Sequence, residues 1–390
     1  MTDNGLKIKR DTLFIIGCLL LFIQFWTNSL FIINEYIFYI PAFMCIILSI
    51  NFKKLNQKEI ITIIALNILG LIIYIFSKSM NILKITLILS AAKNKDIDKL
   101  IKWYFYFGVI ILLIHIFCSA VLNMGTLYEQ GDFGRGVVEK RYYFGFSHAN
   151  NLQLLFDVIL ILWLYTYFMS IKNPKKKMLY TFVALILVLI GYTLTKSRTG
   201  LIIAVIAIIL SIVYSQNNYK LFIKNYRNIQ IFYILIIISI IIMVCFFNGT
   251  TIFNYANKLM TGRLEFANRV LQRYNLLTLF GQQISSAFDT GFGYNIYITV
   301  DQGIISPLLS YGIIINILFH IAQLKLIKKY CLSYNYKRIM IILAMLFYSI
   351  TENILFYAFT NVGIFFIADL IFDNRRTKNG RKNRNTNTNV

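Results

Sequence analysis

The chain has 390 residues, of which 58% are hydrophobic and 14% are charged, and its formal net charge is +23. Soluble domains are usually about 45–50% apolar and ~25% charged, so a soluble protein of this composition could not cover its own surface with polar groups. The composition therefore excludes a soluble globular enzyme, a disordered chain and a nucleic-acid binder with a basic groove. It predicts an all-α, polytopic membrane bundle.

Long apolar blocks predict twelve membrane-spanning helices, several of them shorter than the ~20 residues that a perpendicular helix needs. In chain order the expected spans are 11–28, 36–51, 59–76, 79–92, 102–123, 148–170, 178–195, 199–215, 229–248, 302–324, 338–353 and 355–373. The expected organisation is a single transmembrane domain over residues 1–374, followed by a disordered, basic cytoplasmic tail at 375–390.

The basic residues support this count, because Lys and Arg accumulate on the cytoplasmic side of membrane proteins. With a cytoplasmic N-terminus, most of the 39 basic residues fall in inner segments, and both termini are expected in the cytoplasm. Two long loops, 124–147 and 249–301, then face outward. Long connections are often functional.

The remaining basic residues oppose the topology signal, since all but Lys84 lie on the outer side and Lys84 lies within the fourth span. We interpret them as a site for an anionic substrate, because arginine recognises phosphate through two parallel hydrogen bonds. The alternative is solvated loop charge, or pairing with Glu129, Asp132, Glu139 and Glu265. These basic residues are Lys78, Lys84, Arg135, Lys140, Arg141, Lys196, Arg198, Lys258, Arg263, Arg269 and Arg273.

The segment 261–278 in the second long loop alternates with the period of an amphipathic helix. Glu265, Arg269, Gln272 and Arg273 share one stripe, and apolar residues occupy the other side. Such a helix is expected at the membrane surface, with a plain lid helix packed on the bundle as the alternative.

The entrance of the sixth span holds a second polar group of residues. Ser147 is expected to cap the helix, His148 and Asn151 lie one turn apart, and Gln153 and Asp157 continue a polar stripe. Polar groups at such an entrance commonly face a cavity. The alternative is that His148 and the asparagines only cap the helix and satisfy loop backbone.

Two further features complete the candidates. Lys196 and Arg198 lie in a tight outer turn, where Arg198 adds a cation to a helix N-terminus that already favours anions. Asp301 lies where the large loop re-enters the membrane, and it is either a general base or a helix N-cap. Lys84 and Glu352 are expected to be functional or paired, because unpaired charge within a span is costly; for Lys84, reaching to the outer surface is the alternative.

Four segments, in this order, resemble the O-antigen and capsular polysaccharide polymerases, a family grouped with the O-antigen ligases. Residues 144–150 (FGFSHAN) resemble the family's G-F-x-H-P-N segment, and 197–200 (SRTG) match its S-R-T-G turn. Residues 259–263 (LMTGR) resemble the L-T-G-R start of its loop helix. Residues 300–302 (VDQ) with 311–314 (YGII) resemble its re-entry segment. Ligases carry histidine where this chain has Asp301, which favours a polymerase.

The resemblance implies a metal-independent glycosyltransferase without a cofactor, in the bacterial cytoplasmic (inner) membrane. It would join undecaprenyl-pyrophosphate-linked oligosaccharide repeat units at the outer face, for capsule, exopolysaccharide or O-antigen. Membrane lipids, a flippase and chain-length regulators would be its partners. The alternatives are a ligase-type glycan transferase and a lipid-linked oligosaccharide flippase or exporter.

The resemblance also implies roles for the candidate residues. Asp301, with His148 second, would act on the acceptor hydroxyl, and Arg198 and Arg263 would bind the donor pyrophosphate. The remaining candidates for substrate binding are Arg135, Arg141, Asn151, Lys196, Arg269, Arg273, Lys84 and Glu352.

Overall fold

The computed structural model describes residues 3–31, 33–133, 136–215, 226–260, 262–274, 277–284, 287–289, 295–297 and 300–372. Arg135 and the basic tail lie outside these ranges. The elements are α1 (Asp3–Thr27), α2 (Tyr36–Ser49), η1 (Phe52–Lys54), α3 (Gln57–Ser77), α4 (Asn81–Ala91), α5 (Ile97–Ala120), β1 (Tyr128–Asp132), β2 (Val138–Tyr142), α6 (Ala149–Thr166), η2 (Phe168–Ser170), α7 (Pro174–Thr195), α8 (Arg198–Ser215), α10 (Tyr226–Cys245), α11 (Thr251–Leu259), α12 (Arg263–Leu271), β3 (Ala287–Asp289), β4 (Asn295–Tyr297), α13 (Ile305–Tyr311), α14 (Ile313–Leu332), α15 (Tyr336–Ser349), η4 (Val362–Ile367) and α16 (Ala368–Ile371).

Six of these helical segments are long and apolar enough to cross a membrane: α3, α5, α6 with η2, α7, α8 and α10. The apolar helices α2, α4 and η4–α16 are shorter. The mostly helical architecture agrees with the predicted membrane bundle, whereas these six helices do not by themselves establish twelve spans.

Helix α6 forms the centre of the bundle and packs against α5, α7, α8 and α15. In the apolar stretch of α6, 61% of the residues are buried inside the protein, compared with 17% in α10 and 22% in α3. Helices α10 and α3 present Ile and Leu side chains outward. A helix that is apolar on all sides is stable only when protein or lipid covers every face. Polar residues on α6 are therefore enclosed by protein, and this sets up the site described below.

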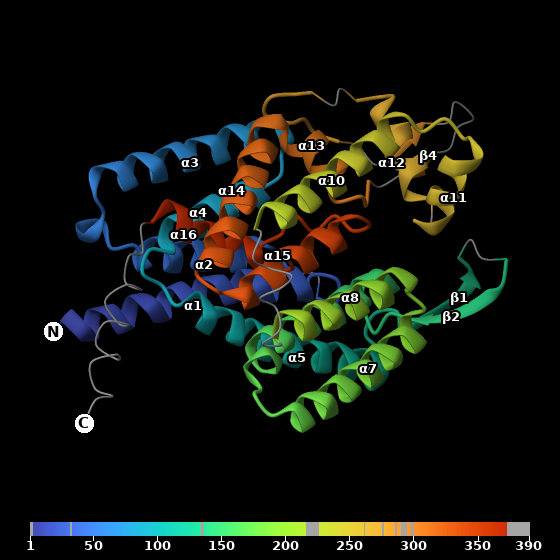
Figure 1. Cartoon of the computed structure of the whole chain (residues 1–390), viewed down its shortest axis with the longest axis horizontal. Helices are drawn as coiled ribbons and strands as arrows, with labels where there is room; N and C mark the ends of the chain where they lie inside the picture. Colours follow the sequence, from blue (N-terminus) through green and yellow to red (C-terminus); the bar gives the residue numbers. More distant parts are fainter. Residues whose placement is uncertain are drawn as a thin grey trace.

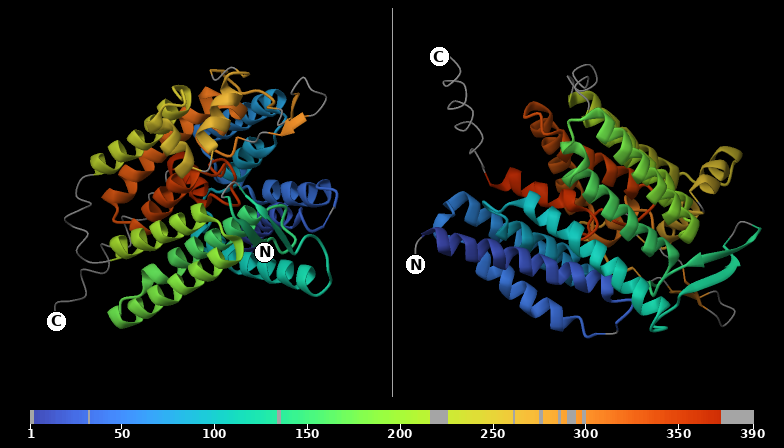
Figure 2. Two further views of the ribbon diagram at one scale, coloured as in Figure 1. Left: turned by 90° about the vertical axis from the view of Figure 1, so that its right-hand side faces the viewer. Right: turned by 90° about the horizontal axis from the view of Figure 1, so that it is seen from below.

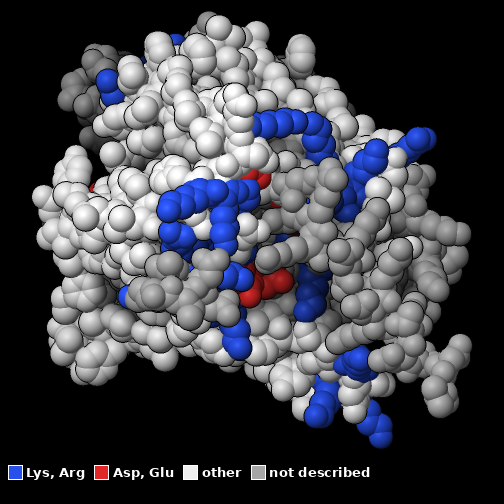
Figure 3. Space-filling view, turned by 90° about the vertical axis from the view of Figure 1, so that its left-hand side faces the viewer, with Lys and Arg blue, Asp and Glu red and all other residues white. Residues whose placement is uncertain are grey.

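The bundle has two chemically different ends (Figures 1 and 2). We call one the loop end; it carries the β1–β2 hairpin, α11 and α12. We call the other the basic end; it carries the start of α1, η1, the α4–α5 connection and the α14–α15 connection. Figure 3 shows Lys and Arg side chains gathered on the basic end around a few acidic ones. Both long loops predicted to face outward thus lie opposite the start of α1.

The predicted span 302–324 is broken into α13 and α14 at Gly312, which has φ +81°. A side chain here would collide with the backbone of Leu279 and Gly281. The returning end of the large loop lies against this break, since the N–H of Ile313 donates to the carbonyl of Thr278 at 2.9 Å. A broken helix at membrane depth is tolerated where protein covers the freed backbone groups.

The predicted last span, 355–373, is not a continuous α-helix over the residues that the structure describes. Turns extend to Thr360, followed by the 3-10 helix η4 and the single turn α16. The Asn361 amide donates to the carbonyl of Leu355 at 2.9 Å and accepts from the N–H of Gly363, which replaces helical bonds. The prediction of one continuous helix was wrong. The segment is apolar because it is buried in protein, and Phe365 and Phe366 are both 0% exposed.

The topology can be tested with single cysteines placed in a variant that lacks the native cysteines. Tyr255→Cys lies on exposed α11 at the loop end, and Ser333→Cys lies in the exposed α14–α15 connection at the basic end. We expect an impermeant maleimide to label position 255 in intact cells, and position 333 only after the membrane is opened. The reverse pattern would contradict the proposed orientation.

Candidate functional site

Ionisable side chains from separate segments of the chain meet at the loop end. Four charged side chains act on His148, namely Arg141, Asp301, Glu129 and Arg263. Two of them, Arg263 and Asp301, also act on Glu352. We call this set the outer cluster: Glu129, Arg141, His148, Arg263, Asp301 and Glu352. The sequence analysis had named each of them except Glu129 as a site residue.

The β1–β2 hairpin supplies Glu129 and Arg141, which are opposite each other across the strands. The Arg141 guanidinium lies 3.2 Å from the Glu139 carboxylate and 3.9 Å from the centre of the Phe133 ring. Arg141 is 6% exposed, so its charge is held in one place by these contacts. The Tyr143 hydroxyl donates to Glu129 and ties the hairpin to the start of α6.

His148 is the N-cap of α6, and the predicted cap, Ser147, is not. The Nδ1 atom of His148 accepts the N–H of Asn150 at 3.1 Å. Ser147 instead accepts the side-chain amide of Asn151 at 2.7 Å. Desolvation and then the Arg141 charge lower the pKa of His148, although Asp301 opposes them. The imidazole is therefore neutral at pH 7 with its proton on Nε2, which makes it a hydrogen-bond donor to the site and not a ready base.

Arg263, the first residue of α12, is buried and paired. Its guanidinium lies 2.7 Å from the Glu352 carboxylate and also donates to the carbonyl of Thr351. Arg263 is 7% exposed, which leaves little of it open to a ligand. The role in pyrophosphate binding stays a prediction, and the contacts that the structure shows are those by which Arg263 holds Glu352 and the Thr351 carbonyl.

The amphipathic helix predicted over 261–278 ends at Leu271 in the structure. Its apolar face is fully buried at Leu264, Ala267 and Val270. The Asn268 amide donates to the carbonyl of Val244 at the end of α10, at 2.8 Å. Helix α12 is thus a lid packed on the bundle, which is the alternative that the sequence left open.

Glu352 lies beyond the end of α15, in the turn at the loop end. Burial raises the pKa of its carboxyl to about 7, against the lowering effect of Arg263, and Asp301 adds to the rise. A carboxyl that ionises near neutrality suits proton transfer at physiological pH. The sequence had indicated that Glu352 is functional or paired, and it was named there as a candidate for substrate binding.

Asp301 is not the cap of the helix that follows it. The N-cap residue of α13 is Ile304, and the side-chain oxygen of Gln302 accepts the N–H groups of Ile304 and Ile305 at 3.0 and 2.6 Å. Asp301 is exposed, and no residue in the described part of the chain forms an ion pair or hydrogen bond with its carboxylate. This leaves Asp301 available to a substrate.

Gly303 brings Asp301 to Glu352. Its N–H donates to the carbonyl of Ser349 at 2.9 Å. A Cβ at this position would lie 2.2 Å from the Glu352 carbonyl oxygen, so only glycine permits the approach. The segment before α13 and the end of α15 are thereby in contact, and the charge of Asp301 acts on Glu352.

A buried polar network lies beneath the outer cluster. Thr195 donates to Gln153 at 2.7 Å, Gln153 donates to Asp157 at 2.7 Å, and Tyr348 donates to the second Asp157 oxygen at 3.0 Å. Because an unsatisfied buried polar group is costly, this network fixes α6, α7 and α15 relative to one another. The sequence analysis noted Gln153 and Asp157 as a stripe but did not assign them a role.

The turn with Lys196 and Arg198 packs onto the same part of α6. A Cβ on Gly200 would lie 2.1 Å from Gln153 and 2.8 Å from Asp157, so the turn fits closely there. Lys196, with φ +53°, lies with its ammonium 5.9 Å from the Tyr192 ring. Arg198 is exposed and has no ion pair within the described ranges. It is therefore one of the exposed cations at this end that are open to an anion.

An apolar groove of about 400 Å³ runs between α5, α6 and α7. Phe105, Leu112 and Trp163 contribute to its walls, together with the polar side chains of Gln153 and Asp157. Gly191, which also lines it, lies five residues before Lys196, or about 7.5 Å along the helix. The groove thus ends roughly two helical turns from the cations of the outer turn.

The remaining predicted binding residues are not part of the outer cluster. Arg269 is exposed and pairs with Glu265 one turn away, an arrangement worth only about 0.3–0.5 kcal/mol. Arg273 is exposed on the same lid. Asn151 is bonded to Ser147, and Arg135 lies outside the described residues.

Lys84 belongs to a separate cluster that the sequence did not reveal. Its ammonium donates to the Tyr39 hydroxyl at 2.7 Å, and that hydroxyl donates to Glu35 at 2.6 Å. Lys84 is 7% exposed, so it does not extend to the outer surface. The prediction that Lys84 is paired is confirmed, because it is hydrogen-bonded to Tyr39, which joins α2 to α4.

This arrangement predicts unequal effects of two substitutions. Tyr39→Phe removes the acceptor from a buried ammonium and is expected to destabilise the protein by about 1–3 kcal/mol. Lys84→Met leaves Tyr39 bonded to Glu35 and should cost less. Thermal unfolding in detergent measures both, and the double variant should resemble Lys84→Met. Equal losses in the two single variants would contradict the pairing.

The Arg263–Glu352 pair predicts a destabilisation that depends on pH. Arg263→Ala removes the cation that lowers the pKa of Glu352, and an uncompensated buried charge costs up to about 3–5 kcal/mol. Below pH 7 the carboxyl takes up a proton and the cost is small. The difference in unfolding temperature between wild type and Arg263→Ala should therefore widen as pH rises through 7. The double variant with Glu352→Gln should abolish this pH dependence, and persistence of the dependence there would refute the pairing.

The chain matches no family model, no curated protein and no solved structure.

Proposed function

We propose that the protein is a polysaccharide polymerase that joins undecaprenyl-pyrophosphate-linked oligosaccharide repeat units at the outer face of the bacterial cytoplasmic membrane. The observation that carries this proposal is a pair of carboxyl groups at the loop end, with the charge of one acting on the other. Asp301 is exposed and unpaired among the described residues, and the pKa of Glu352 is about 7. Four sequence segments that resemble the polymerase family lie at or near this end of the bundle.

The reaction requires one bond to form and one to break. The acceptor sugar hydroxyl attacks the anomeric carbon of the donor glycan, and the bond from that carbon to the pyrophosphate oxygen breaks. The electron pair leaves with undecaprenyl pyrophosphate, and the hydroxyl proton passes to a carboxylate. Asp301 is placed to orient the hydroxyl, and Glu352 to hold the proton at neutral pH.

The leaving group needs cations and a place for its lipid. Arg198 and Lys196 supply positive charge at the N-terminal end of α8, where helix geometry already favours an anion. The apolar groove between α5, α6 and α7 ends close to this turn and suits a polyprenyl chain. Head and tail of the donor are thus accommodated by adjoining parts of the structure.

The arrangement favours chemistry over transport. The outer cluster and the Arg198 turn concentrate titratable groups at one end of the bundle, whereas a flippase needs a polar route across the membrane. The neutral, donating His148 and the fixed Arg141 fit recognition of sugar hydroxyls at the same end.

The test is reconstitution of the purified protein in nanodiscs with a lipid-linked repeat unit. A polymerase releases undecaprenyl pyrophosphate in step with a ladder of glycans that remain lipid-linked. Release that requires a different acceptor lipid would indicate a ligase. Movement of the lipid-linked glycan across a vesicle membrane without pyrophosphate release would indicate a flippase and overturn the proposal.

A further inference from the structure

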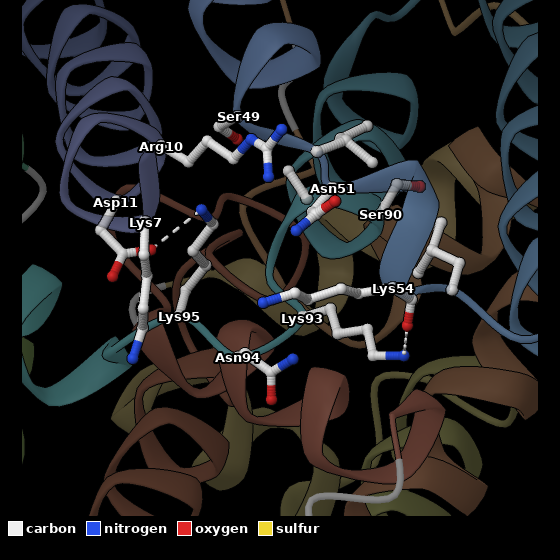
Figure 4. Close-up of a pocket in the computed structure, with 13 residues that line it drawn as sticks. Lys7, Arg10, Asp11, Ser49, Asn51, Lys54, Ser90, Lys93, Asn94 and Lys95 are labelled. Carbon is white, nitrogen blue, oxygen red and sulfur yellow. Dashed lines mark hydrogen bonds and ion pairs between the residues drawn. The ribbon is translucent and has the colours of Figure 1, made fainter. Parts of the chain in front are cut away.

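A cavity of about 110 Å³ lies at the basic end, remote from the loop end (Figure 4). It is enclosed by the start of α1, the connection from α2 through η1, and the α4–α5 connection. On the same measure one water needs roughly 10–15 Å³, so the cavity has room for several waters or for one small polyatomic anion. The basic residues that line it are Lys7, Arg10, Lys54, Lys93 and Lys95, and the single acidic residue is Asp11.

Two of these cations are neutralised within the protein. Lys95 lies 3.0 Å from the Asp11 carboxylate. Lys93 pairs with Glu59 and also donates to the carbonyl of Lys54. These bonds fix the walls of the cavity, because each joins two different segments of the chain.

The other cations have no such compensation. Neither Arg10 nor Lys54 forms an ion pair with any described residue, and in Figure 4 both side chains extend into the space between α1 and η1. The side-chain amide of Asn51, also on the wall, has no hydrogen bond within the described part of the chain. Guanidinium, ammonium and amide donors thus converge on one cavity.

This convergence is unfavourable without a ligand. Burial lowers the pKa of Lys95, and the charges of Arg10 and Lys7 lower it further, against the opposing effect of Asp11. The positive-inside bias requires basic residues at this end of a membrane protein, but it does not require them to surround a shared cavity. Lys53 and Lys99, which do not line the cavity, satisfy the same bias outside it.

We propose that this cavity binds a phosphate group, held by Arg10, Lys54 and Asn51. Phosphate oxygens accept charge-assisted hydrogen bonds, and the arginine fork matches two of them at once. The group comes either from an acidic phospholipid headgroup or from a soluble phosphate compound. By the topology argued above the cavity faces the cytoplasm, but the binding itself depends neither on that orientation nor on polymerase activity.

The experiment measures the apparent unfolding temperature of the full chain in phosphatidylcholine nanodiscs. Inorganic phosphate is added in one arm, with chloride at matched ionic strength as the reference. Phosphatidylglycerol is included in the nanodiscs of the second arm. A ligand that binds only the folded protein raises the unfolding temperature with concentration. A shift in the first arm assigns a soluble phosphate, and a shift in the second arm alone assigns a lipid headgroup.

The variant Arg10→Gln/Lys54→Gln should lose the shift, with affinity falling about 10- to 100-fold for each cation removed. The matched control Lys53→Gln/Lys99→Gln removes the same charge from the same end, outside the cavity, and should retain it. No shift in either arm, or an equal shift in both double variants, would overturn the proposal, because binding would then be absent or merely a response to net charge.

Discussion

Asp301→Asn is expected to lower the rate of polymerisation by about 10²–10⁴ while leaving the amount of folded protein unchanged. The carboxylate is exposed and caps no helix, so its loss removes no structural bond among the described residues. The amide keeps the shape but carries no charge, so it orients the acceptor hydroxyl toward Glu352 less well. Initial rates of undecaprenyl pyrophosphate release in nanodiscs measure the effect.

Glu352 adds a pH dependence to the same prediction. Because its pKa is about 7, the fraction ionised rises as pH increases through neutrality. If the ionised carboxylate receives the proton, the wild-type rate should rise through pH 7 and then level off. Glu352→Gln should abolish this rise, whereas Asp301→Asn should retain it at a lower rate.

Two controls make this assignment decisive. Asp132→Asn changes an exposed carboxylate in the hairpin, outside the outer cluster, and should behave as wild type. His148→Asn keeps a residue that caps helices well but removes the Nε2 donor. Normal rates in Asp301→Asn together with loss of activity in His148→Asn would transfer the main role to the histidine.

The sequence predicts which segments are apolar, because lipid and protein interior both select the same side chains. It does not distinguish them, and this explains the wrong last span. The run from Leu355 to Phe372 is apolar because α14, α15 and their neighbours cover it, and Asn361 then sets turns in place of helix.

The sequence predicted most residues of the site, but not which of them contact one another. Arg263 and Glu352 are 89 residues apart, and no local pattern encodes their pairing. The burial that raises the pKa of Glu352 is likewise a property of the folded protein. Gln302, and not Asp301, accepts the N–H groups of Ile304 and Ile305, which follow it in the chain.

Arg198→Ala is expected to reduce the rate about 10²–10³-fold, the usual effect of removing one group that stabilises developing negative charge. Arg198 and Arg263 were predicted to have the same role, but their environments differ. Arg263 is buried against Glu352, whereas Arg198 is exposed at the start of α8 without an ion pair in the described structure. Loss of Arg198 should therefore lower activity without lowering the unfolding temperature.

The conservative change Arg198→Lys separates charge from geometry. Lysine restores the cation as a point charge but loses the planar fork that bonds two pyrophosphate oxygens at once, so recovery of the rate should be partial. Arg269→Ala is the matched control, because it removes an exposed arginine of the same end whose partner is a neighbour on its own helix. If the leaving group binds at Arg198, the Ala variant should also bind undecaprenyl pyrophosphate more weakly in competition measurements, while Arg269→Ala should not. Equal rates and equal competition in the two alanine variants would mean that Arg198 is solvated loop charge, and the pyrophosphate site would have to be sought elsewhere among the loop-end cations.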